Sequence, residues 1–254
     1  MNAYPRFGQF FSSLDRRSDH DGVMSEATGQ NEESPTTLEG RMAAARKRLK
    51  RASAALAPKH KGGEWEEYRA AHAAVLSLER TIAQAKGEEY VEPLDFPVRW
   101  CTGAPLPHLI ANDYKTLLVF LVDRPDPKWD GSYVTIKSPA DRDVESLALV
   151  EFIRCASAKL GNPNDEVLSG HPLDGKGLDP YTPQIVRNSR WLAELERINS
   201  VHRQYNPERW RKLNHYVFWF HDTTFECVAE SYKLELFEES VFNLLARVCQ
   251  RMTS

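Results

Sequence analysis

The sequence predicts an α+β protein, in which a mainly antiparallel sheet packs with helices and is preceded by an N-terminal helical hairpin. Three patterns support this fold class. Residues 38–56 carry apolar side chains at alternating steps of four and three, which is the spacing of one helix face. Residues 116–122 (TLLVFLV) form an apolar run of strand length, as in a central strand. Residues 214–232 contain two aromatic and β-branched runs around a polar tetrad, which indicates a β-hairpin.

The N-terminal part of the chain divides into a tail and two helices. Residues 1–36 are rich in Ser, Asp, Glu, Gly and Asn, and we expect them to be disordered. The first helix has Thr36 or Thr37 as its N-cap, and a second helix follows a break that contains Pro and Gly. Residues 37–92 are thus predicted to form an antiparallel helical hairpin, which we expect to serve self-association or docking to a partner protein. A linker over residues 92–97 is expected to lead to the second domain.

Residues 93–254 are predicted to form an α+β domain that carries any functional site. A hairpin with a long loop is expected over residues 123–137. Residues 147–160 fit both helical spacing and strand alternation, so the type of this element stays open. Helices are expected over residues 184–205 and 240–252, because apolar side chains recur there at helical intervals.

The hairpin within residues 214–232 is predicted to have one apolar and one mixed face. With Asp222 and Thr223 as its loop, side-chain alternation places His215 opposite Glu230 on the mixed face. Aromatic rings and small apolar side chains then share the other face: Tyr216, Phe218, Phe220, Phe225, Cys227 and Ala229. The apolar phase changes after this face, which predicts a bulge or a strand end beside Glu230.

The candidate catalytic residues are His215, Glu230, His221 and Asp222. An imidazole beside a carboxylate supplies a general base, or a metal ligand with its supporting partner. His221 and Asp222 lie at a loop tip, where binding groups concentrate. The competing interpretation of His215 and Glu230 is a half-exposed charge pair that adds ~0.2–1 kcal/mol to the sheet.

The candidate ligand-binding residues are His171, Lys176 and His202. The first two lie in residues 161–183, the longest irregular stretch, and such loops are usually functional or disordered. Residues 170–177 fit G-x-x-x-x-G-K but lack the Ser or Thr that holds magnesium, so we reject a P-loop. An anion cradle of glycine amides with Lys176 remains as a hypothesis. His202 is expected to face inward from the predicted helix, where a structural role in the core competes with a functional one.

Two classes of function follow. In the first, the protein is an enzyme or a small-ligand binder whose polar site gathers these histidines and carboxylates. A metal held by two histidines and one carboxylate would leave a position open for water, whereas a metal-free site would use His215 as base, so the metal is left unknown. In the second, the protein is a non-enzymatic interaction module, such as a regulatory, defence or toxin-neutralising partner. It would dock through the helical hairpin or an exposed sheet face, with tryptophan anchors such as Trp129, Trp210 and Trp219.

Composition and charge limit the partners and the cellular location that we expect. The net charge of −3 argues against nucleic acid as a partner, and we expect glutamates of the second helix to neutralise the basic residues between 41 and 61. No apolar run approaches the length of a membrane span, so we expect no membrane association. The four cysteines lack metal-ligand spacing and have apolar neighbours, which suits buried free thiols in a reducing cytoplasm. No motif of a known family is recognised.

Overall fold

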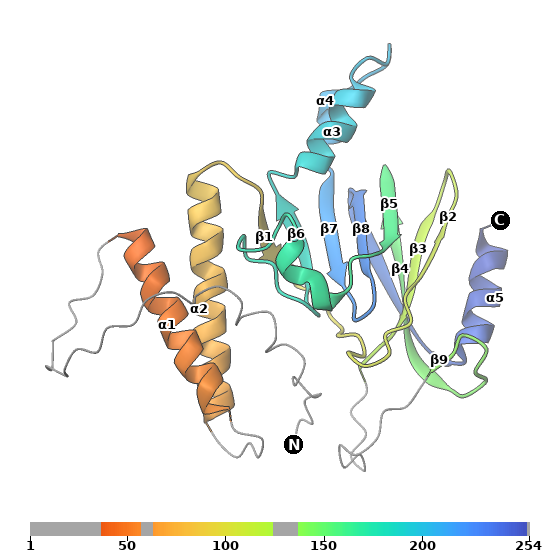
Figure 1. Cartoon of the computed structure of the whole chain (residues 1–254). Coiled ribbons are helices and arrows are strands. Elements are labelled where there is room, and N and C mark those ends of the chain that lie inside the picture. The colour runs from red at the N-terminus through yellow and green to blue at the C-terminus, as the bar shows by residue number, and fades with distance from the viewer. Residues whose placement is uncertain (1–36, 57–62, 124–136, 253–254) are drawn as a thin grey trace, which may run out of the picture.

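The computed structural model describes residues 37–56, 63–123 and 137–252 of the chain. Its centre is a pair of antiparallel sheets that pack face to face, with helices on the outside (Figure 1). The α+β class and the antiparallel sheet predicted from the sequence are therefore confirmed. The tail over residues 1–36 and most of the hairpin expected over residues 123–137 lie outside the described residues.

The described strands form a five-stranded sheet in the order β1-β6-β7-β8-β5 and a four-stranded sheet in the order β2-β3-β4-β9. The first sheet consists of β1 (Tyr90–Pro93), β6 (Pro183–Arg187), β7 (Asn214–Trp219), β8 (Thr224–Ala229) and β5 (Ser157–Gly161). The second sheet consists of β2 (His108–Ala111), β3 (Thr116–Leu121), β4 (Glu145–Ile153) and β9 (Ser231–Glu239). Every residue of β3 is buried, as the apolar run predicts for an inner strand.

An aromatic core fills the space between the two sheets. Phe218 of β7 and Phe152 of β4 approach across it with ring centroids 6.0 Å apart, and Trp100 stacks on Phe218 at 5.5 Å. The predicted apolar face of the β7–β8 hairpin lines this core in full: Tyr216, Phe218, Phe220, Phe225, Cys227 and Ala229. The inward orientation of these side chains, predicted from strand alternation, is thus confirmed.

The element left open between residues 147 and 160 consists of strand β4 and most of β5. One face of β4 meets the aromatic core, and the other face meets the last helix, α5 (Val241–Arg251). A strand buried on both faces loses the apolar–polar alternation, which is why its sequence resembles that of a buried helix. The helix predicted over residues 240–252 is confirmed as α5.

The chain passes between the sheets from β1 to β2, from β4 to β5 and from β8 to β9, and the last two passages lie side by side. β4 continues into β5 through Arg154, which has a left-handed φ of 51°, and β8 continues into β9 through Glu230. The Glu230 amide donates to the Ile153 carbonyl at 3.0 Å, and the side chains of Arg154 and Glu230 form an ion pair. The strand end predicted beside Glu230 is therefore confirmed, and it is the corner at which the chain changes sheets.

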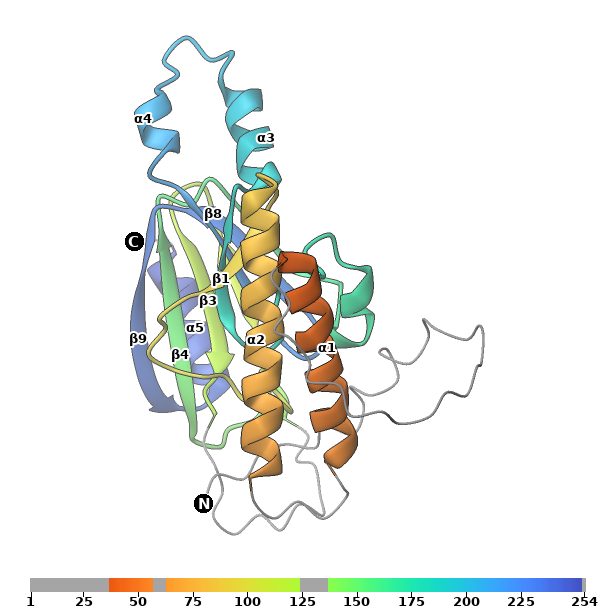
Figure 2. The same cartoon turned by 90° about the vertical axis from the view of Figure 1, so that its left-hand side faces the viewer.

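The predicted helical hairpin is present as α1 (Leu38–Ala55) and α2 (Glu64–Ala85), which lie side by side along one flank of the molecule (Figure 2). Thr37 caps α1, because its hydroxyl oxygen accepts from the Gly40 amide at 3.1 Å. Arg48 of α1 donates to Glu67 of α2 at 2.7 Å, so the second helix does neutralise part of the basic face.

The hairpin is attached to the sandwich through α2 and β1. The Arg80 guanidinium donates to the carbonyls of Val91 at 2.6 Å and Gly177 at 3.0 Å. β1 pairs with β6 as an edge strand, so Glu92 and Pro93 belong to the sheet and the linker expected to start there is wrong at its beginning. Pro93 is tolerated because it is the last residue of an edge strand.

The helix expected over residues 184–205 is wrong at both ends, because only residues 190–199 are helical. Residues 183–187 form β6, which lies between β1 and β7 and receives backbone hydrogen bonds from both. Asn188 then adopts a left-handed φ of 52°, which turns the chain out of the sheet, and Ser189 caps the helix that follows. A short apolar segment fits a helix as well as a strand, and the local sequence does not show which strands it pairs with. Periodicity alone therefore started the helix too early.

Two short helices project from one end of the sheets (Figure 1). They are α3 (Arg190–Asn199) and α4 (Pro207–Trp210), and α4 starts with the Asn cap and Pro expected from the sequence. His202 lies beyond the end of α3 and is exposed, so the expectation that it faces inward is wrong. Within the described ranges, no helix combines the length and the apolar character that crossing a membrane requires.

The cysteines differ in their exposure. Cys227 is buried in the aromatic core, Cys101 and Cys155 are half-buried, and Cys249 is exposed on α5. All four are free thiols, but the expectation that they are buried holds for Cys227 alone.

Candidate functional site

The β7–β8 hairpin turns at His221 and Asp222, where the Phe220 amide donates to the Thr223 carbonyl at 2.9 Å. As a result, Val228 lies opposite His215, and the predicted pairing of His215 with Glu230 is wrong. The register differs from the predicted one by an even number of residues, so each side chain still points to the expected face. The carboxylate that reaches His215 is therefore one from the same face of β8, but nearer to the turn.

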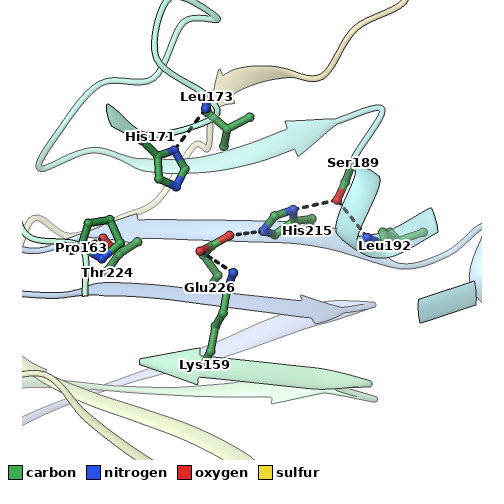
Figure 3. Close-up of polar contacts among 9 residues, drawn as sticks. All are labelled: Lys159, Pro163, His171, Leu173, Ser189, Leu192, His215, Thr224 and Glu226. Atoms are coloured by element: carbon green, nitrogen blue, oxygen red, sulfur yellow. Dashed lines mark hydrogen bonds and ion pairs between the residues drawn. The ribbon is translucent and has the colours of Figure 1, made fainter. Parts of the chain in front are cut away.

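That carboxylate is Glu226. Its Oε2 lies 2.8 Å from Nε2 of His215, on the outer face of the five-stranded sheet (Figure 3). Its Oε1 lies 2.8 Å from Nζ of Lys159, which is the residue opposite Glu226 on β5. The His215 and Glu226 side chains are 4% and 9% exposed, whereas the Lys159 side chain is 55% exposed. The pair is thus buried and reaches solvent through the lysine.

Ser189 extends the network on the other side of the imidazole. Its Oγ lies 2.8 Å from Nδ1 of His215 and also accepts from the Leu192 amide at 3.0 Å as the N-cap of α3. The Trp191 ring packs edge-on against His215 at 5.0 Å, and the Lys159 ammonium lies 4.5 Å over the same ring. The left-handed Asn188 and the start of α3 position Ser189 over the sheet.

Electrostatics fixes the direction of these hydrogen bonds. Burial raises the pKa of Glu226, but hydrogen bonds from His215 and Lys159 have the larger combined effect and lower the pKa to about 2. An ionised carboxylate only accepts hydrogen bonds, so His215 donates through Nε2–H. When the imidazole is neutral, Nδ1 carries the lone pair and the Ser189 hydroxyl donates to it.

His171 lies on the same face of the sheet, in the segment that follows the 3-10 helix η2 (Asp165–Gly170) (Figure 3). Its ring packs edge-on against Trp219 at 5.0 Å, and its Nδ1 accepts from the Leu173 amide at 3.2 Å. Burial lowers its pKa, a smaller effect of Glu226 opposes this shift, and a smaller effect of His215 adds to it, so the three side chains share one environment. The structure thus brings two of the candidate site residues, His171 and His215, into the same region.

His221 belongs to a second polar cluster, at the other end of β7. Its Nδ1 lies 2.9 Å from Asp165 Oδ2 and 3.1 Å from the Tyr181 hydroxyl, which donates to Asp165. Asp222 is exposed, and its Oδ1 lies 3.9 Å from Nε2 of His221. A strand rise of about 3.3 Å per residue places His221 roughly 20 Å from His215, so the two histidines do not form one site.

The remaining candidates lie elsewhere. Glu230 pairs with Arg154 at the corner between the sheets. The imidazole of exposed His202 accepts from the Gln204 amide within its own loop, at 3.1 Å. The polar site expected to gather His202, His215 and His221 is therefore not formed, and among the described residues no group of three or more His, Cys, Asp or Glu could hold a metal ion.

The groups that were expected to form an anion cradle in residues 170–177 contact carboxylates of the protein instead. The Gly177 amide donates to the Glu79 carboxylate at 3.3 Å, and the Lys176 ammonium lies 3.9 Å from Glu88. Both groups that were expected to hold an anion thus face carboxylates of the helical hairpin and of the chain after it. This segment joins the hairpin to the sandwich.

Sequence reasoning missed Ser189 and Lys159. A serine directly before an apolar-periodic segment is an N-cap signal. Because the predicted helix began at residue 184, Ser189 was placed inside it and was not recognised as a cap. Lys159 lay in the element whose type was open, and only its pairing with Glu226 across β5 and β8 gives it a role.

Comparison with known proteins does not assign the chain to a family. No protein-family model matches this sequence, and neither the curated proteins nor the solved structures give a significant match.

Proposed function

We propose that this protein is an enzyme that transfers acyl groups through Ser189, with His215 as general base and Glu226 as the residue that orients it. One observation carries the proposal: Ser189, His215 and Glu226 form a continuous chain with two contacts of 2.8 Å each. A hydroxyl that donates to an imidazole, which in turn donates to a carboxylate, is the arrangement that activates a serine nucleophile.

The chemistry follows from these contacts. Ser189 Oγ attacks the carbonyl carbon of an ester or another activated acyl compound and gives its proton to His215 Nδ1. Glu226 stabilises the imidazolium that forms, and the leaving oxygen takes the proton from Nδ1 as its bond to the acyl carbon breaks. Water then gives its proton to Nδ1, attacks the acyl group and releases Ser189, which recovers the proton.

The place of Ser189 in the fold supports this role. As the N-cap of α3, it lies where the helix dipole favours the negative charge that develops on the acyl oxygen. Ser189 is 8% exposed, and the exposed Lys159 and half-buried Trp191 lie beside the network. We place the entry of the acyl group there.

A competing explanation is that the network only fastens α3 to the sheet. Ser240 provides the matched comparison, because it is also a buried N-cap: it is 3% exposed, and its Oγ accepts from the Asn243 amide at 3.2 Å. Among the described residues, no histidine hydrogen-bonds to Ser240. A cap with no imidazole should stabilise its helix without being a nucleophile.

The two explanations are separated by reaction with a fluorophosphonate probe, followed by peptide mass spectrometry. The wild type and Ser240→Ala should be phosphonylated at Ser189, and Ser189→Ala should not. His215→Ala should react about 10²–10⁴-fold more slowly, since that is the usual contribution of a general base. A folded wild type that stays unlabelled, or Ser189→Ala labelled at the wild-type rate, would overturn the proposal.

A further inference from the structure

We infer that Lys159 is a positioning residue that holds His215 in its neutral form, by compensating the negative charge of Glu226. The inference rests on the proposed function, because a base must be neutral before it can accept the Ser189 proton. Lys159 itself does not touch the serine. It would act through the carboxylate that it shares with the imidazole.

The geometry places Lys159 at the end of the network. Its ammonium lies 2.8 Å from one oxygen of Glu226, while His215 lies 2.8 Å from the other oxygen. The strand register holds Lys159 directly opposite Glu226, and the Trp191 ring holds its ammonium from one side at 4.5 Å. The carboxylate therefore lies between a permanent cation and a titratable one.

His215 and Lys159 both interact electrostatically with the negative charge of Glu226, and their effects on the protonation of His215 are opposite. An anion beside an imidazole favours the imidazolium, whereas a nearby ammonium opposes it. If the charge of Lys159 is removed, Glu226 becomes a buried anion with His215 as its remaining hydrogen-bond donor. Burying an uncompensated charge is costly, so protonation of His215 would then be favoured.

Protonation of His215 would reverse the contact with Ser189. Nδ1 would carry a proton and become a donor, so it could no longer receive the proton of the serine hydroxyl. The Ser189 oxygen already accepts from the Leu192 amide and can accept from Nδ1–H as well. The network would keep its shape, but it would lose its base.

The other groups that face His215 do not replace Lys159. His171 approaches from the segment after η2, and burial lowers its pKa, so it tends to be neutral. At the start of α3, Glu89 lies 3.5 Å from the Arg190 guanidinium, so that the two charges offset each other. Lys159 is thus the cation that balances Glu226.

The inference is tested by NMR titration of histidine-labelled protein, with the His215 signal assigned through His215→Gln. In Lys159→Met the pKa of His215 should rise by about one unit or more, which is the usual effect of an unbalanced neighbouring charge. Lys159→Arg keeps the charge and should titrate like the wild type. Lys233 is exposed on β9 of the other sheet, so Lys233→Met controls for the loss of a lysine as such.

The rate of fluorophosphonate labelling gives a second readout. For Lys159→Met, the pH at half-maximal labelling should move upward by the same amount as the His215 titration. An unchanged or lowered pKa of His215 in Lys159→Met would overturn the inference, and so would a His215 that is already protonated at neutral pH in the wild type. Labelling of Ser189 without this shift would refute the role of Lys159 alone. The shift without any labelling would support that role and refute the acyl-transfer proposal.

Discussion

At the scale of single residues, two glutamates of the same chain segment have different roles because their neighbours differ. Glu226 points to the outer face of the sheet and meets His215 and Lys159. Glu230 lies at the corner between the sheets and meets Arg154. Burial of a carboxylate is tolerated only with partners of this kind. Sequence reasoning found the histidine but chose the wrong glutamate, because the choice depends on where the turn begins.

The ionised state of Glu226 should make stability depend on pH. Its folded pKa of about 2 lies below the ordinary 4.5, so its contacts stabilise the fold fully above about pH 4.5 and are lost as the pH falls towards 2. Glu226→Gln should lower the free energy of unfolding at pH 7 by on the order of 3 kcal/mol. The difference from the wild type should shrink as the pH falls from 4.5 towards 2.

Urea unfolding at pH 7, 4 and 3 measures this difference. Glu208→Gln is a suitable control, because Glu208 is exposed on α4, and it should show no such trend. A constant difference between Glu226→Gln and the wild type across these pH values would contradict the prediction.

At the scale of elements, alternation determines faces, but it does not determine register. The rings of the β7–β8 hairpin point inward as predicted, while the partners of each residue differ from those predicted. The loop contains no Asn-Gly or Asp-Gly pair to fix the turn, so alternatives that differ by two residues satisfy the same pattern. Likewise, β6 was taken for helix because its partner strands lie far away in the sequence.

The inward face should account for much of the stability of β7. Phe218 is fully buried between the sheets, and Phe218→Ala should lower the free energy of unfolding by ~3–5 kcal/mol, because it leaves a cavity. Leu236 of β9 is 58% exposed, so Leu236→Ala should have a much smaller effect. Thermal unfolding followed by circular dichroism would compare the two, and losses of equal size would contradict the assignment of the faces.

At the scale of the whole molecule, the helical hairpin and the sandwich meet through several polar contacts, two of which are made by Arg80. The Arg80 guanidinium reaches both the start of the sheet and the loop at Gly177, so a single side chain joins α2, β1 and that loop. The hairpin was predicted from the spacing of its apolar residues, but this attachment could not be, because it joins residues far apart in the sequence. A role for residues 37–92 in binding a partner stays a prediction.

Gly177 should be required for this attachment. Its φ is +86°, and a Cβ at this position would lie 2.5 Å from Arg80 Cγ and 3.0 Å from the Val91 carbonyl. Gly177→Ala should therefore cost ~1–3 kcal/mol and increase hydrogen exchange in α2 and β1. Gly170→Ala is the matched control, since a Cβ there meets nothing within 4 Å. Equal exchange in the two variants would contradict this expectation.

The two crossovers beside Arg154 and Glu230 also constrain how the sandwich can move. Because two of the three covalent links between the layers lie at this corner and an ion pair joins them, we expect the layers to separate less readily here than at a distance from it. Transient opening of the protein would therefore spare this corner. The Glu230 amide, bonded there to Ile153, should be among the last backbone protons to exchange with water.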